Sequence, residues 1–136
     1  MIFSQSSQYA IKSCIYLARN NKVIGVTEIA EFINSPISFT SKILQRLAKN
    51  EIISSTKGRN GGFYLNEFQL QTITIKEICT VFEQKELLHG CILGKLNCSE
   101  INPCPVHHIA LIVNEKLRKI LSFKIIELKD IGSIKL

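Results

Sequence analysis

The chain has 136 residues, 46% of them hydrophobic, and a formal net charge of +6 at pH 7. This length and hydrophobic content suit one compact domain and exclude a wholly disordered chain. No apolar run approaches the roughly 20 residues that cross a bilayer, and the first residues lack the pattern of a signal peptide, so we expect a cytoplasmic protein with no membrane partner. The excess of Lys and Arg favours a polyanionic partner such as nucleic acid.

The first 50 residues are expected to form three amphipathic helices. Apolar residues recur with helical spacing from about residue 6 to residue 19. A second helix is predicted from Thr27, as its N-cap, to Asn34, and a third is opened by Ser35 and Pro36. Five polar residues project from the outer face of this third helix: Ser38, Ser41, Lys42, Gln45 and Lys49.

A β-hairpin is predicted to follow. Residues 52–56 and 63–65 are β-prone, and Asn60-Gly61 between them is typical of a tight hairpin turn with positive φ angles. Three helices and a hairpin with a basic tip form the pattern of a winged helix-turn-helix domain, whose third helix fits the major groove of double-stranded DNA. Taken singly, each polar residue is more typical of a solvated surface, but the helix order, the basic wing and the net charge together favour DNA binding. The expected DNA contacts are Ser38, Ser41, Lys42, Gln45, Lys57, Arg59 and Asn60.

The second half of the chain combines a short helix, a loop and a long helix. Thr74 and Glu77 make a capping box that predicts a helix ending near residue 82. Helical periodicity then fails over residues 84–105, where glycines and prolines mark an irregular loop. The long helix, from about Val106 to Leu121, has a broad apolar face that a two-fold homodimer would bury. The fold class expected is therefore mainly α with a small β-wing.

Five cysteines are present, an odd number, and a reducing cytosol disfavours disulfides. Cys14 and Cys79 lie on apolar helix faces and are expected in the core. The other three form, with a histidine, a Cys-x6-Cys-x5-Cys-x2-His array of soft ligands for zinc or an iron–sulfur cluster. The array lacks the tight Cys-x2-4-Cys pair of most zinc sites, and its wide spacings favour a cluster, although zinc stays open. The expected ligands are Cys91, Cys98, Cys104 and His107, with His89 in reserve.

These features together resemble the IscR/NsrR family of bacterial winged-helix regulators over nearly the whole chain. The resemblance is carried by Tyr9-Ala10, by Ser-Lys-Ile-Leu-Gln-Arg-Leu at residues 41–47, by the wing at 57–63 and by the late cysteine triplet. It implies a homodimer that binds a palindromic DNA operator. It also implies one iron–sulfur cluster per subunit, held by the three late cysteines.

The same resemblance bears on the fourth ligand. IscR-like members have a histidine at the position of His107, which goes with a 2Fe–2S centre. NsrR-like members hold a 4Fe–4S centre and can take a carboxylate from the first helix of the partner subunit. Gln8 occupies the matching position in this chain and is a poor ligand. The resemblance thus favours His107 and a 2Fe–2S cluster, with 4Fe–4S as the alternative.

The function expected is a transcriptional regulator whose operator binding depends on an iron–sulfur cluster that senses redox state, nitric oxide or iron supply. The alternative is a cluster-free or zinc-bearing winged-helix regulator that senses thiol oxidation or a metabolite, and the remote alternative is an electron-transfer protein. An enzyme is not expected, because no nucleotide-binding glycine motif or recognisable acid/base pair is present. The expected division is a DNA-binding region at 1–83, a cluster-binding loop at 84–105, and a dimerisation helix and tail at 106–136.

Overall fold

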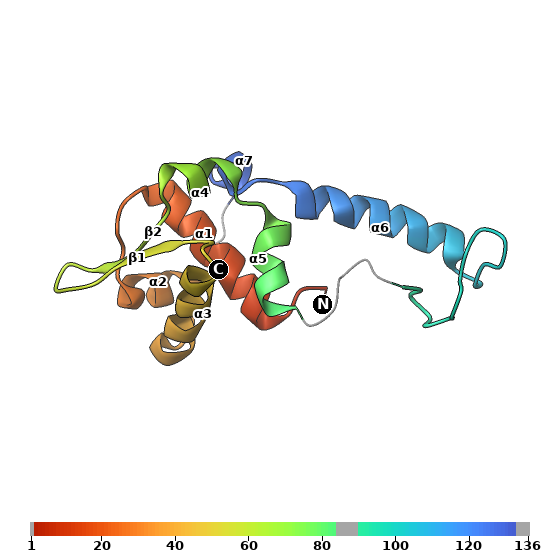
Figure 1. Cartoon of the computed structure of the whole chain (residues 1–136), viewed down its shortest axis with the longest axis horizontal. Coiled ribbons are helices and arrows are strands. Elements are labelled where there is room, and N and C mark those ends of the chain that lie inside the picture. Colours follow the sequence, from red (N-terminus) through yellow and green to blue (C-terminus); the bar gives the residue numbers. More distant parts are fainter. Residues whose placement is uncertain (1, 84–89, 133–136) are drawn as a thin grey trace.

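The structure is a computed structural model that describes residues 2–83 and 90–132. Figure 1 shows one body built from α1 to α5, α7 and a two-stranded hairpin, with α6 projecting from it. The expected mainly α fold with a small wing is confirmed. The elements in chain order are α1 (Gln5–Asn20), α2 (Val26–Ile33), α3 (Ile37–Lys49), β1 (Ser54–Thr56), β2 (Gly62–Tyr64), α4 (Glu67–Thr72), α5 (Ile75–Phe82), α6 (His107–Ser122) and α7 (Ile125–Leu128).

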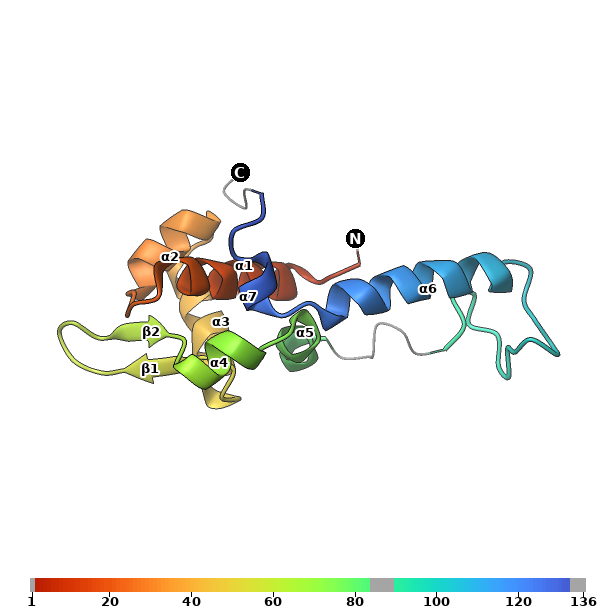
Figure 2. The same cartoon turned by 90° about the horizontal axis from the view of Figure 1, so that it is seen from above.

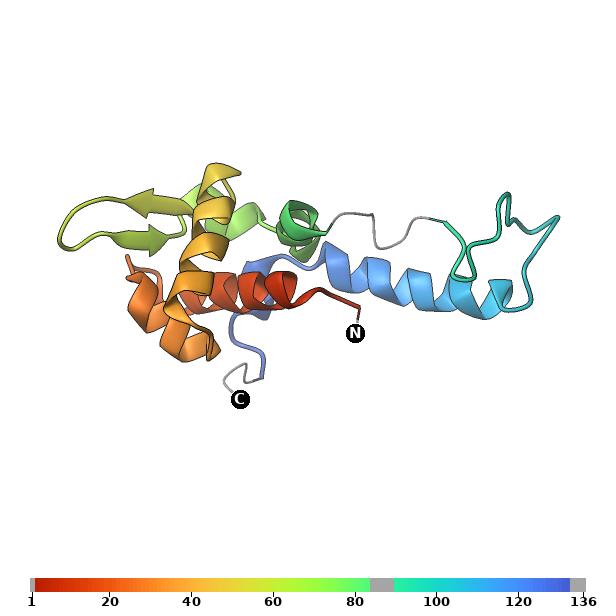
Figure 3. The ribbon, with the colours of Figure 1, turned by 90° about the horizontal axis from the view of Figure 1, so that it is seen from below.

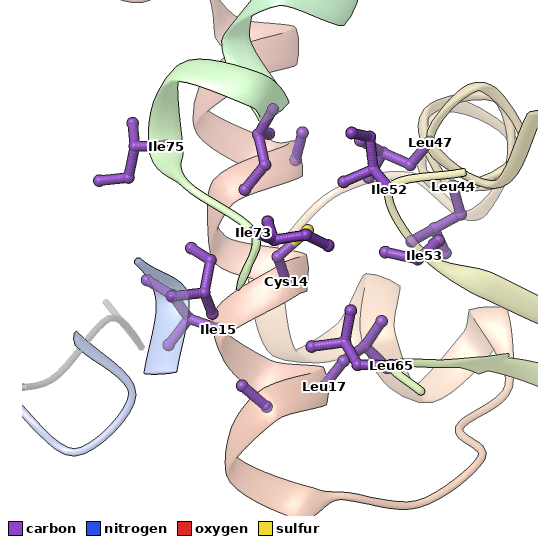
Figure 4. Packing of buried hydrophobic residues seen from close by; sticks show 14 of the residues in the cluster. Cys14, Ile15, Leu17, Leu44, Leu47, Ile52, Ile53, Leu65, Ile73 and Ile75 are labelled. Carbon is purple, nitrogen blue, oxygen red and sulfur yellow. The ribbon is translucent and has the colours of Figure 1, made fainter. Parts of the chain in front are cut away.

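Helix α1 forms the centre of the body. Its start is capped by Ser4, whose hydroxyl accepts a hydrogen bond from the Ser7 N–H, and it ends at Asn21 in the left-handed conformation. Figure 4 shows its buried side chains surrounded by residues of α3, of the hairpin and of the segment that begins α5. Cys14 and Cys79 are both buried in this core, as their helical positions predicted.

Two predicted helix starts are wrong by one or two residues. Helix α2 begins at Val26 with Gly25 as N-cap, because the bridge between Ile24 and Phe63 of the hairpin holds the preceding backbone extended. Helix α3 begins after Pro36. Ser35 does not cap it, because its hydroxyl makes no hydrogen bond among the described residues, while its N–H donates to the Ala30 carbonyl and closes the preceding helix. Tertiary pairing and the end of one helix therefore set where the next begins.

The hairpin forms, but its turn differs from the prediction. Ser55 of β1 pairs antiparallel with Phe63 of β2. The positive φ in the connecting loop belongs to Gly58, at 103°, and not to Asn60-Gly61. Gly62 is required for a different reason: a Cβ there would overlap the carbonyl of Ile24, to which the wing is bonded. The wing is thus shaped by close backbone contact with the strand-like residues before α2.

The chain after α6 returns to the winged-helix body. The Ile75 N–H donates to the Phe123 carbonyl at 3.0 Å, and the Ile125 N–H donates to the Ile73 carbonyl at 2.9 Å. Ile125 is fully buried, and the Arg19 guanidinium donates to carbonyls of the segment that follows α7. The carboxyl end of α6 is therefore anchored beside the start of α5, while its amino end lies away from the body (Figure 2).

We expect Ile125→Ala to lower the free energy of unfolding by about 2–5 kcal/mol, because it empties a fully buried site between α1, α4 and α7. Ile131→Ala is the matched control, since that side chain is 67% exposed. Denaturant unfolding followed by circular dichroism measures both. Equal stability of the two variants would show that the returning segment is not part of the folded core.

Among the described residues, no helix combines the length and apolar character needed to cross a membrane.

Candidate metal centre and DNA-binding surface

Three of the predicted metal ligands converge at the far end of α6. The sulfur atoms of Cys91, Cys98 and Cys104 all lie within 4.8 Å of one another. Cys104 is buried and the other two are half-buried. They border a cavity of about 350 Å³ whose walls come only from residues 90–98, Cys104 and α6. Figure 3 shows this segment folded against the amino end of α6, beyond the winged-helix body.

Main-chain groups are directed at these sulfur atoms. The Leu93 N–H donates to the Cys91 sulfur at 3.4 Å, and the Cys104 N–H donates to the Cys98 sulfur at 3.4 Å. Hydrogen bonds from the backbone N–H groups of Lys95 and then Leu93 lower the pKa of the Cys91 thiol to about 7. Burial raises the pKa of Cys104. Cys91 is thus readily a thiolate near neutral pH, which is the form that binds metal.

The two remaining cysteines have the opposite character. Burial raises the pKa of Cys14 to about 12 and that of Cys79 to about 11. A thiol held protonated inside the core is inert toward metal and oxidant. The structure therefore separates two packing cysteines from three clustered ones.

His107 lies at the edge of the thiol group. Its Nδ1 is 3.3 Å from the Cys98 sulfur, whereas its Nε2 is buried without a hydrogen-bond partner among the described residues. His108 is exposed and meets His107 only edge to face. The reserve ligand His89 lies outside the described residues.

These residues fit a thiophilic metal group. Three thiols and one imidazole make four donors, the number that tetrahedral zinc or one iron–sulfur cluster requires. Their sulfur atoms adjoin a common cavity, and the buried Nε2 of His107, which has no hydrogen-bond partner among the described residues, fits a ligand nitrogen better than a packing histidine. The donor set does not distinguish zinc from a cluster. Gln8 lies in α1 of the body, where its amide donates to the Phe3 carbonyl at 2.9 Å.

The predicted DNA contacts lie on α3 and the wing, and all are exposed except Ser41, which is half-buried. An open groove of about 710 Å³ separates the two elements. Ser41, Gln45 and Lys57 line it, and the Gln45 amide donates to the Ser41 hydroxyl at 3.0 Å. Ser38, Lys42, Arg59 and Asn60 are exposed but do not line the groove.

Lys49 also lines this groove and was not among the predicted contacts. It lies in the last turn of α3, where the helical pattern alone treats it as a solvated end. The sequence showed a basic residue on the outer face of this helix. It did not show that the wing lies opposite that residue.

Helix α3 is held against the end of α5 by a contact that sequence patterns did not indicate. The Arg46 guanidinium donates to the Val81 carbonyl at 2.6 Å and lies over the Phe82 ring, 4.8 Å from its centroid. One residue later, the Glu83 carboxylate accepts hydrogen bonds from the Ser4 N–H at 2.9 Å and the Ser7 hydroxyl at 2.7 Å. The point where the chain leaves toward the cysteines is therefore tied to both α3 and α1.

A comparison with protein families matches residues 3–131 to the Rrf2 model, described as an iron-dependent transcriptional regulator. The chain belongs to the Rrf2 family. The match includes the winged-helix body, the segment with the three clustered cysteines (residues 90–105, the cysteine segment) and α6. This Rrf2 protein is therefore a transcriptional regulator, and the resemblance stated from the sequence is confirmed at the level of the family.

Individual Rrf2 relatives agree with this assignment. The chain is 38% identical over 111 residues to a candidate HTH-type transcriptional regulator of Aquifex aeolicus (strain VF5), covering 79% of this chain and 76% of that protein. It is 24% identical over 119 residues to the HTH-type transcriptional regulator IscR of Klebsiella pneumoniae (strain 342), covering 86% and 72%.

Solved structures share the fold of this Rrf2 chain. CymR, the global cysteine regulator of B. subtilis, superposes with a TM-score of 0.74 at 18% identity, over 96% of this chain and 98% of that one. IscR of T. potens superposes with a TM-score of 0.68 at 19% identity, over 98% and 90%. Likeness at this identity establishes the winged-helix architecture, and the site residues must be judged on their own chemistry.

Proposed function

We propose that this Rrf2 regulator binds operator DNA as a homodimer and that an iron–sulfur cluster held by Cys91, Cys98, Cys104 and His107 sets its DNA affinity. A 2Fe–2S cluster is favoured over 4Fe–4S because His107 contacts one of the thiols and because Gln8 stands where NsrR-like members have a carboxylate. The convergence of three sulfur atoms within 4.8 Å carries the proposal. Four donors next to a cavity of about 350 Å³ support it.

DNA binding is assigned to α3 and the wing. Ser38, Ser41, Lys42 and Gln45 would face the major groove, where amide and hydroxyl groups read base edges and lysine neutralises phosphate. Lys57, Arg59 and Asn60 of the wing would contact the adjacent backbone or minor groove. The groove between the two elements, with Lys49 and Lys57 on its walls, suits the passage of a phosphate strand.

We assign the homodimer interface to α6. Only Leu117 and Leu121 of this helix are buried, while Ile109, Ile112, Val113 and Ile120, which share one face by their helical spacing, are between 43% and 66% exposed. Such an exposed apolar face is costly in water and is typical of an interface. A two-fold dimer would cover it with the same surface of a second copy, and two-fold symmetry accounts for a palindromic operator.

We expect Ile112→Glu to convert the dimer to a monomer, because a carboxylate on that face would have to be buried without a partner. Ile131→Glu, on an exposed residue outside α6, is the matched control. Analytical ultracentrifugation gives the mass of each variant. If the Ile112→Glu protein is still a dimer, α6 is not part of the dimer interface.

A bound cluster would supply iron that oxidants, nitric oxide or iron shortage can remove, so that occupancy of the site reports these conditions. The chain's part is to connect the site with α3. The body end of α6 is bonded to the start of α5, and the far end of α5 is bonded to Arg46 of α3. Order in the cysteine segment is thereby linked to the position of α3, and DNA must reciprocally affect retention of the cluster.

The test is an anaerobic preparation in which metal content and DNA affinity are measured together. Visible absorption, with iron and acid-labile sulfide near two per chain, and operator binding that changes after iron chelation are the expected results. One zinc per chain without colour would favour the zinc-bearing alternative. DNA affinity unaffected by the metal content would contradict metal gating.

A second candidate is a cluster-free regulator that responds to thiol oxidation or to a metabolite. The fold likeness to the cysteine regulator CymR and the pKa of about 7 at Cys91 favour it. In that case metal-free protein would bind DNA, and a mild oxidant alone would change the affinity. Membership of a family of transcriptional regulators argues against a pure electron carrier or an enzyme.

We expect His107→Ala to speed cluster loss by about tenfold or more, because His107 is the only non-thiol donor among the described residues whose side chain contacts a sulfur of the site. His108→Ala removes a neighbouring imidazole that is exposed and is the control. Decay of visible absorption in the presence of a chelator measures the rates. Equal rates for the two variants would mean that a group other than His107 is the fourth ligand.

A further inference from the structure

The cysteine segment has almost no hydrophobic packing of its own. Its four large apolar side chains, Ile92, Leu93, Leu96 and Ile101, are between 61% and 97% exposed. Most of its backbone hydrogen bonds close short turns, such as that from Gly94 to the Cys91 carbonyl and that from Ser99 to the Asn102 carbonyl. Neither packing nor local turns explain why thiols from three separate positions lie together.

Lys95 makes the contact that joins the two stretches between the cysteines. Its ammonium donates to the Asn102 carbonyl at 3.1 Å, to the Asn102 side-chain oxygen at 2.9 Å and to the Pro103 carbonyl at 3.2 Å. All three donors of the ammonium are thereby used. Among the described residues outside the ligand set, no other side chain connects the stretch before Cys98 with the stretch after it.

The position of Lys95 makes this contact relevant to the ligands. The residue is half-buried and forms part of the cavity wall beside Cys91, and its acceptor Pro103 directly precedes Cys104. Holding residue 95 against residues 102 and 103 closes a loop that contains Cys98. Hydrogen bonds from a charged donor are stronger than neutral ones, so the closure persists without support from a core.

We propose that Lys95 is a positioning residue of the metal centre, which uses its ammonium to hold the three thiols at ligand distance before metal binds. This inference rests on the proposed function only in that the thiols bind a thiophilic metal; it does not depend on the identity of the cluster. An ordered site binds more tightly because less conformational entropy is lost when the ligands are fixed.

The test is an anaerobic titration of reduced, metal-free protein with Co²⁺, whose thiolate complexes absorb visible light. We expect Lys95→Met to weaken Co²⁺ binding by about 10- to 100-fold, the usual effect of removing a group that orients metal ligands. Lys95→Arg should recover most of the affinity, because a guanidinium can still donate to the same carbonyls. Lys76→Met, at an exposed lysine of α5, is the control for loss of charge and should match the wild type.

A second measurement needs no metal. In metal-free protein, Lys95→Met should speed hydrogen exchange at the Ser99 and Asn102 amides, which are bonded within the loop that Lys95 closes, while exchange in α1 stays unchanged. Asn102→Leu keeps two of the three acceptors and should have a smaller effect on both readouts.

The outcomes separate the two proposals. If Lys95→Met binds Co²⁺ as the wild type does, the positioning role is wrong while the metal centre stands. If the wild type itself binds no Co²⁺ with thiolate absorption, the metal centre fails and the inference fails with it. If Lys95→Arg is as weak as Lys95→Met, the contacts described above do not position the thiols.

Discussion

Replacement of Cys91, Cys98 and Cys104 together by alanine is expected to abolish cluster uptake and the response of DNA binding to it. The three side chains supply every sulfur donor of the group within 4.8 Å, and His107 alone cannot hold a thiophilic metal. The folded body should remain intact, because it is built around α1 and the cysteine segment lies beyond it. Visible absorption, iron content and operator affinity of the variant, with and without iron chelator, measure the effect.

The chain offers a matched control for this experiment. Cys79→Ala also removes a thiol, but one that is buried in the core and whose pKa is raised to about 11 by that burial. It should lower thermal stability without changing metal content. A triple variant that still responds to iron chelation would refute the assignment of the sensing site to these cysteines.

The double variant Lys57→Met/Arg59→Met is expected to weaken operator binding most at low salt. Each basic side chain that neutralises a phosphate releases counterions, so the slope of log affinity against log salt should flatten by about 2 when both are removed. The loss should be nearly the same for operator and random DNA, since phosphate contacts carry little sequence information. Fluorescence anisotropy at several salt concentrations measures the slope.

Lys76→Met is the control for charge, because that lysine is exposed on α5 outside the groove between α3 and the wing. It should leave the slope close to that of the wild type. A double variant with an unchanged slope would mean that the wing does not contact the DNA backbone. Gln45→Ala separates the two kinds of contact, because loss of a base contact relaxes specificity at one position instead of lowering all affinities alike.

The fold of the chain itself connects the cysteine site with the DNA-binding surface. The cysteines lie at the far end of α6, yet both chain connections from that region lead to α5: one through the anchored end of α6 and one through the residues that follow Phe82. Arg46 bonds the end of α5 to α3, while Ser4 and Ser7 bond Glu83 to α1. In the proposed mechanism, a change of order near the cysteines would reach the DNA-binding helix through α6, α5 and the contact of Arg46 with α5.

Local signals were sufficient for much of the fold. The apolar spacing in α1, the N-cap at Thr74 and the length of α6 depend on residues within one or two helical turns, and each was correctly predicted. The same kind of signal for α4 was present but overlooked: Asn66 and Gln69 form a capping box of which the structure records both hydrogen bonds. The late cysteine array likewise marked the candidate metal centre from its spacing and residue types alone.

The helical pattern, the basic wing and the set of soft ligands could thus be predicted from the amino-acid sequence, because these features depend on neighbours along the chain. Four features became visible only in the folded chain: the turn at Gly58, the return of Ile125 to the core, the contact of Arg46 with α5 and the contact of Lys95 within the cysteine segment. Each of these joins residues whose partners are set by packing or by loop closure. The free energy of such contacts depends on the whole fold, and no local periodicity encodes it.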